Sequence, residues 1–136
     1  MTFFLDACIS PNFSAALKLF GEDVIHLTDL YRADTKDSEW IPRVCRDGLV
    51  VITADQAQIK TRGKTHVECA LYQKYRGRAF FLPNGFSTWP IRKQLACFFR
   101  AWPAIAEQAA KMQLGVFYDV LENGSLKQKH ARKVNV

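Results

Sequence analysis

The chain of 136 residues predicts an α/β fold, an α/β/α sandwich around a central and mainly parallel sheet, with a C-terminal β-hairpin. Short apolar runs alternate four times with segments of helical periodicity, as expected for strands joined by crossover helices. The run LVVIT at 49–53 has no polar alternation, which is typical of a parallel strand covered on both faces. Asn123-Gly124 lies between two strand-like runs and is a strong hairpin signal.

The N-terminal elements follow from local pattern. Residues 2–7, TFFLDA, are apolar with two aromatic rings and predict a buried first strand. Ser10 or Pro11 can begin a helix that Gly21 ends, with one apolar face made by Phe13, Leu17 and Phe20. Residues 23–27, DVIHL, predict a second strand, and the polar stretch TDLYRADTK that follows is expected to be irregular.

A short helix is expected over 37–48, capped by Asp37 or Thr35, with Pro42 in about its first turn, where a missing N–H is tolerated. After the third strand, a helix is expected within 60–77, with one side formed by Val67, Ala70, Leu71 and Tyr75. A fourth strand (79–83), a long helix interrupted at Pro103 (88–115) and the hairpin (116–128) complete the chain.

Composition excludes several classes of protein. The formal charge of +6 attracts polyanions, no apolar run approaches the roughly 18 residues of a membrane span, and the N-terminus lacks a basic signal region, so a cytoplasmic location is expected. The four cysteines have no C-x-x-C spacing, so buried reduced thiols are expected in place of disulfides or zinc. His26 and His66 have no partners at ligand spacing, which favours structural or surface roles.

Acidic residues follow two of the apolar runs. Asp6 comes after the first strand, Asp55 after the third, and Asp37 and Glu39 begin the helix that leads into the third. Sites in such sheets form at the carboxyl ends of strands, where gathered carboxylates repel by about 4 kcal/mol per pair at 4 Å and a dielectric of 20. Oxygen-only acidic sites suit Mg²⁺ or Mn²⁺, which can activate water beside a scissile phosphate. The alternative is that Asp37 caps its helix and the others are loop acids.

Other nucleotide folds fit poorly. There is no G-x-G-x-x-G after the first strand and no phosphate-binding G-x-x-x-x-G-K-[ST] loop. The segment LDACISP has no second aspartate two residues after Asp6, and the residues expected of a response-regulator receiver after the fourth and fifth strands are missing.

The segments FFLDACISP, DSEWIPRVCRDGLVVITADQ and AFFLP resemble PIN-like ribonucleases, over about residues 1–120. They look most similar to the small branch formed by the toxins of toxin–antitoxin pairs, with a VapC45-type PIN-like domain. The resemblance implies a metal-dependent endoribonuclease in which Asp6, Asp37 and Asp55 ligate Mg²⁺ or Mn²⁺. It also implies that the hydroxyl of Thr53 steadies the site, where Thr53 is in addition a candidate contact of the substrate.

The chain departs from the broad PIN pattern in one place. Larger members have a further glutamate on a helix between the first two of these aspartates. Here that interval is short and offers no clear match, and Glu39 and Glu68, which lie after it, are candidates for a fourth carboxylate. The alternative function is therefore a catalytically inactive PIN-like module that binds nucleic acid or a protein partner. Lys60, Arg62 and Lys64 follow Asp55 and are candidates for contacts with RNA phosphates, or else belong to a solvated loop.

We expect a PIN-like domain over 1–122, followed at 123–136 by the return of the hairpin and a basic tail that is either solvated or in contact with RNA or a partner. The segments 89–112 and 116–128 are candidate surfaces for an antitoxin protein or for a homodimer. No membrane partner is expected. Trp40 is expected to pack beneath the site, because it lies close to Asp37.

Overall fold

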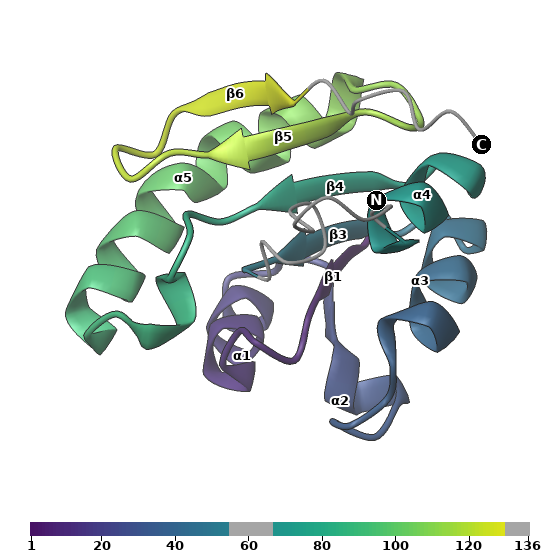
Figure 1. Ribbon diagram of the computed structural model, residues 1–136. Helices are drawn as coiled ribbons and strands as arrows, with labels where there is room; N and C mark the ends of the chain where they lie inside the picture. Colours follow the sequence, from purple (N-terminus) through teal and green to yellow (C-terminus); the bar gives the residue numbers. More distant parts are fainter. Residues whose placement is uncertain (55–66, 130–136) are drawn as a thin grey trace.

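The computed structural model describes residues 1–54 and 67–129. Its centre is a six-stranded sheet in the order β2-β1-β3-β4-β5-β6 (Figure 1). The strands are β1 (Phe3–Leu5), β2 (Val24–His26), β3 (Val50–Thr53), β4 (Arg78–Phe81), β5 (Phe117–Val120) and β6 (Leu126–Lys129). The first five are parallel and β6 is antiparallel to β5, so the predicted α/β fold and its C-terminal hairpin are confirmed.

Helices cover both faces of the sheet (Figure 1). They are α1 (Pro11–Leu19), α2 (Leu27–Leu30), α3 (Asp37–Arg46), α4 (Val67–Lys74) and α5 (Ile91–Lys111), with a 3₁₀ turn over Phe86–Thr88. The side chains of α1 and α5 share one core cluster with the sheet, and those of α2, α3 and α4 share the other. The sandwich expected from the alternation of strands and helices is therefore present.

Successive side chains of a strand point alternately into the two cores. Phe3 and Leu5 of β1 belong to the core under α1 and α5, whereas Phe4 belongs to the core under α3. In β3, Ile52 faces the first core and Val51 the second, and both are fully buried. An unbroken apolar run is the pattern that such two-sided burial requires.

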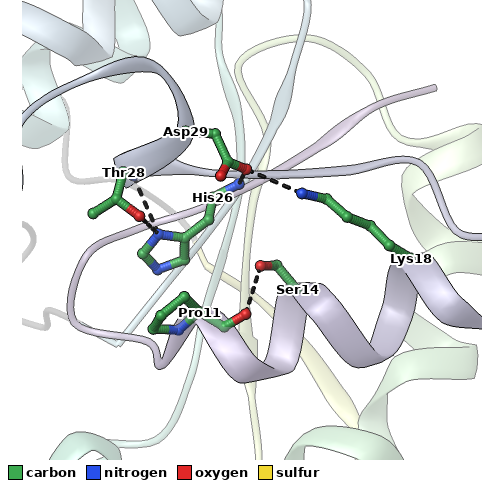
Figure 2. Close-up of polar contacts among 6 residues, drawn as sticks. All are labelled: Pro11, Ser14, Lys18, His26, Thr28 and Asp29. Carbon is green, nitrogen blue, oxygen red and sulfur yellow. Dashed lines mark hydrogen bonds and ion pairs between the residues drawn. The ribbon is translucent and has the colours of Figure 1, made fainter.

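The polar stretch after β2, which was expected to be irregular, begins within helix α2. His26 caps this helix through hydrogen bonds with residues of its first turn (Figure 2). The amide of Thr28 donates to Nδ1 of His26 at 3.2 Å, and the amide of His26 donates to the carboxylate of Asp29 at 2.8 Å. Lys18 of α1 pairs with Asp29 at 3.1 Å. His26 is buried and its Nε2 donates to the carbonyl of Ile9 at 2.7 Å, which confirms a structural role for this histidine.

Two predictions about α3 were wrong. Lys36 occupies the cap position without a side-chain hydrogen bond, and Asp37 is the first helical residue, so neither Asp37 nor Thr35 caps the helix. Pro42 is the sixth residue of α3 and lies beyond its first turn. Four buried side chains of α3 anchor the helix to the core: Trp40, Ile41, Val44 and Cys45. The free energy gained by their burial outweighs the loss of the backbone hydrogen bond that Pro42 cannot donate.

The interruption expected at Pro103 does not occur, because α5 runs unbroken over 21 residues. Interior proline costs about 3 kcal/mol, which is about what the burial of one or two large apolar side chains returns. The helix buries six residues on one face: Cys97, Phe98, Ala101, Trp102, Ile105 and Ala109. The amphipathic face therefore decides the structure here.

The predicted Leu71 and Tyr75 are half-buried and pack against the core, and Tyr72, which was not predicted, is the fully buried residue of this part of α4. The ring of Tyr72 meets the rings of Phe81 and Phe117 edge-on, with centroids 6.2 and 6.0 Å away. These two partners come from β4 and β5, so only the folded sheet determines which face of α4 is buried.

Candidate functional site

Parallel pairing of β1 with β3 places residues after both strands at one edge of the sheet. Leu5 is in register with Ile52, and the amide of Asp6 donates to the carbonyl of Ile52 at 3.0 Å, which continues the pairing by one residue. Asp6 and Thr53 therefore lie side by side although 47 residues separate them. This is the carboxyl-end edge at which sites form in parallel sheets.

The carboxylate of Asp6 is held in a fixed orientation. The hydroxyl of Thr53 donates to Oδ2 at 2.8 Å, and the amide of Ala7 donates to Oδ1 at 2.6 Å. Asp6 is 6% exposed and Thr53 is fully buried, so these bonds are formed in a region of low dielectric. Hydrogen bonds donated to both oxygens favour the ionised carboxylate and fix the direction of its remaining lone pairs.

Cys8 completes this arrangement and was missed as a site residue by the sequence analysis. Its Sγ lies 3.6 Å from Oδ2 of Asp6 and 3.6 Å from the hydroxyl oxygen of Thr53, and it accepts from the amide of Ala54 at 3.3 Å. Burial, and then the negative charge of Asp6, raise the pKa of the Cys8 thiol to about 12. The thiol is therefore neutral at pH 7 and can donate to Asp6. Its spacing of two residues from Asp6 was the available signal.

Asp37 is positioned by the start of α3. Its Oδ1 accepts from Nε1 of Trp40 at 3.0 Å, within the first turn, where the helix dipole favours a negative charge. Trp40 is fully buried and stacks on Phe4 of β1, with ring centroids 5.1 Å apart. Phe4 precedes Asp6 by two residues, so the same strand supports both carboxylates. Trp40 is therefore buried directly beside Asp37, and its place beneath a site stays a prediction. Glu39, in the same turn, is exposed.

Tyr72 lies within the electrostatic reach of both aspartates. Its pKa is raised well above the usual range, first by complete burial and then by the negative charge of Asp6, with further contributions from Cys45, Asp37 and Cys8. The carboxylates of β1 and α3 therefore act on one buried phenol of α4. Sequence reasoning missed Tyr72, because nothing in the local pattern of α4 distinguishes it from Leu71 or Tyr75.

Several predicted residues lie outside the described part of the chain. These are Asp55 and the three basic candidates Lys60, Arg62 and Lys64. Glu68 belongs to α4, but its side chain is outside the description. Within residues 1–54 and 67–129, no group of three or more His, Cys, Asp or Glu side chains is placed to hold a metal.

The donors that the structure does describe are hard oxygens. Asp6 and Asp37 offer carboxylates, and carboxylate oxygen is the ligand that Mg²⁺ and Mn²⁺ prefer. The neutral thiol of Cys8 is poorly suited to ligating these ions, because a thiolate is the ligating form. The donor chemistry therefore fits a hard divalent cation, for which Asp6 and Asp37 would supply two ligands.

Comparison with known proteins agrees with this fold. A family model described as a PIN like domain matches residues 1–84, which extend from β1 to just past β4. The curated proteins and the solved structures compared with the chain contain no match. Among the helices of the described residues, none is both long and apolar enough to cross a membrane. The match covers more than half of the chain, which therefore belongs to the PIN-like domain family, whose members are generally nucleases.

Proposed function

We propose that this protein is a Mg²⁺- or Mn²⁺-dependent endoribonuclease, and that it acts in the cytoplasm as the toxin of a toxin–antitoxin pair. The observation that carries the proposal is the buried Asp6 carboxylate at the end of β1, hydrogen-bonded to Thr53 of β3. Buried charges of one sign are costly unless a cation or a proton offsets them. A hard divalent ion would offset them here, in a family whose members are generally nucleases.

Each residue has a distinct role in this proposal. Asp6, Asp37 and Asp55 would hold the ion, which supplies an activated water and neutralises charge on the scissile phosphate. Thr53 was expected among the substrate contacts, but its full burial and its bond to Asp6 favour a positioning role. Cys8 supports the same carboxylate oxygen.

The remaining candidates extend the site. Glu39 and Glu68 would supply a further carboxylate, and Lys60, Arg62 and Lys64 would contact phosphates of the RNA. Residues 1–122 would form the nuclease domain, with 123–136 as the return of the hairpin and a basic tail. A cognate antitoxin protein would cover the domain, and a small antitoxin gene beside the gene of this protein would favour the toxin role.

The test is cleavage of an end-labelled cellular RNA pool by purified protein, with Mn²⁺, with EDTA and with substituted proteins. Asp6→Asn, Asp37→Asn and Asp55→Asn should each abolish cleavage while circular dichroism shows a native fold. Asp34→Asn is the matched control, because Asp34 is exposed and pairs with the exposed Arg32 at the surface. Full cleavage by Asp6→Asn would remove the assignment of the site.

A second candidate is an inactive PIN-like module that binds nucleic acid or a protein. It is favoured by the missing fourth glutamate of larger PIN domains. Folded protein that cuts no RNA with either metal would establish this alternative. The toxin role is tested separately by inducing the gene in a bacterial host, where growth should stop, and should continue when Asp6→Asn is induced.

A further inference from the structure

The ends of α3 and α4 and the beginning of β4 bring together five cationic side chains. We call them the basic cluster: Arg43, Arg46, Lys74, Arg76 and Arg78. Four of them are exposed and Arg78 is half-buried. None takes part in the ion pairs found among the described residues. Asp47 is the acid next to them in the chain.

Short contacts tie these elements into one surface. The guanidinium carbon of Arg46 lies 4.8 Å from the ring centroid of Tyr75, and Nζ of Lys74 lies 5.5 Å from it. The guanidinium of Arg78 donates to the carbonyl of Gly48 at 3.0 Å, just after the end of α3. A Cβ added at Gly77 would lie 2.5 Å from Sγ of Cys45, so the chain between Arg76 and Arg78 runs directly against α3.

Arg76 holds an unusual backbone conformation. Its φ is +53°, and no other residue except glycine has a positive φ in the described part of the chain. Glycine is the residue normally found in this conformation after a helix, and a long side chain there is strained. Strained residues of this kind are often found at functional sites, so Arg76 is a candidate for a functional role on this surface.

The basic cluster is distant from the acidic site. Arg78 pairs with Val50 at the start of β3, three residues and about 10 Å from Thr53 at its end. Asp37 and Arg46 begin and end α3, which makes them about 14 Å apart along the axis. One helix therefore carries a carboxylate of the site at its first residue and part of the basic cluster in its last turn.

From this arrangement we propose that the basic cluster is a second RNA-binding surface, which holds the phosphate backbone of single-stranded RNA away from the site of cleavage. Like charges gathered on one surface repel, and a polyanion relieves that repulsion. Four of the five cations are arginines, whose planar forks fit phosphate oxygens. The half-buried ring of Tyr75 contacts two of the cations, and aromatic rings set among cations are typical of surfaces that bind single-stranded nucleic acid, which favours RNA over an acidic protein.

The identity of the ligand as RNA rests on the proposed nuclease function, but binding can be measured without cleavage. The probe is a short, fluorescently labelled single-stranded RNA of mixed sequence, titrated in EDTA and followed by anisotropy. The variant carries Arg43→Gln, Arg46→Gln and Arg76→Gln. The matched control carries Lys18→Gln, Arg92→Gln and Lys111→Gln, which remove the same charge from exposed positions on other elements.

Each lost phosphate contact reduces the slope of log K against log salt by about 0.7, so the loss of three contacts reduces it by about 2. At about 0.1 M salt, a slope change of about 2 corresponds to RNA binding about 100-fold weaker in the variant. The control should change affinity much less. Equal losses in variant and control would overturn the proposal, because only net charge would then matter. Poly-glutamate that displaces RNA from the native chain at equal concentration would also overturn it, in favour of an acidic protein.

Arg76→Gly separates binding from folding. This change relieves the positive φ and should raise Tm, yet it should weaken RNA binding about 5-fold near 0.1 M salt. A higher Tm with unchanged affinity would contradict the proposal for this residue. Binding that depends on the cluster in a protein that never cuts RNA would retain this inference and reject the nuclease. A protein that cuts RNA but whose RNA affinity does not change when the basic cluster is substituted would support the nuclease and reject this inference.

Discussion

Replacing Thr53 by valine tests the support of the Asp6 carboxylate directly. Valine keeps the shape of the buried side chain but removes the hydroxyl that donates to Oδ2 of Asp6 at 2.8 Å. A hydrogen bond to a charged group contributes about 1.5–3 kcal/mol, and Thr53 has no access to solvent that could replace it. At about 2.1 cal/mol/K per residue over 136 residues, a loss of 2 kcal/mol lowers Tm by about 7 °C.

Thermal unfolding and RNA cleavage should be measured on the same preparations. Partners that orient a metal ligand typically affect activity by about 10- to 100-fold, so kcat/KM should fall by that factor in Thr53→Val. Thr2→Val is the matched control, because Thr2 also donates to a carboxylate, that of Asp23 at 2.7 Å, but at the exposed surface, where the loss should stay below about 0.5 kcal/mol.

A double-mutant cycle with Asp6→Asn decides whether the hydroxyl acts through the carboxylate. The two changes should couple by more than about 1 kcal/mol in the free energy of unfolding, since both remove the same charge-assisted bond. Additive effects, or a Thr53→Val protein with native Tm and native cleavage, would refute the reasoning that Thr53 positions Asp6.

Three further predictions concern other parts of the structure. Trp40→Phe keeps the buried ring but removes the donor to Asp37, so kcat/KM for RNA cleavage should fall about 10-fold with less change in KM than in kcat; an unchanged kcat would contradict the role of this bond. Gly124→Ala should lower the free energy of unfolding by about 1–3 kcal/mol in urea titrations, because its φ is +85° and its new Cβ would lie 2.8 Å from Cγ of Arg100. Burial raises the pKa of the Cys45 thiol from 9.0 to about 11, so between these pH values the thiol ionises only in the unfolded state. The free energy of unfolding should therefore fall by about 1 kcal/mol as pH rises from 9 to about 11. Cys45→Ala should show a smaller fall, and a fall equal to that of the native protein would exclude this thiol as the cause.

The positions of the strands along the chain and their mainly parallel type could be predicted from sequence because they depend on local pattern, whereas the order of the strands in the sheet was not predicted. In the run at 49–53, the residues that face each side of the sheet are apolar, as in a strand buried on both faces. A residue that follows a buried strand, such as Asp6, lies at the edge where the strand ends. The features that sequence did not reveal depend on contacts between distant elements. Pro103 stays inside a helix because the rest of α5 is anchored, and Tyr72 is chosen over its neighbours by rings of β4 and β5.

The candidate site was predictable to a similar extent. The pairing of Asp6 with Thr53 follows from adjacent parallel strands, and the place of Asp37 follows from the start of α3. The part played by Cys8 had only a weak signal, its spacing of two residues from Asp6, since a cysteine near an apolar run is far more often an inert core residue. Asp55 stays a prediction.

The amide of Asp6 extends the pairing of β1 with β3, and β1 itself lies between the edge strand β2 and β3. Hydrogen exchange at this amide therefore requires β1 and β3 to separate, and we expect it to be slow compared with exchange in the exposed loops of the described chain. The backbone that carries the Asp6 carboxylate is thus part of the paired sheet. Local melting at this edge would have to break that pairing, so a partner that covers the edge of the intact sheet is the simpler way to inhibit the proposed nuclease.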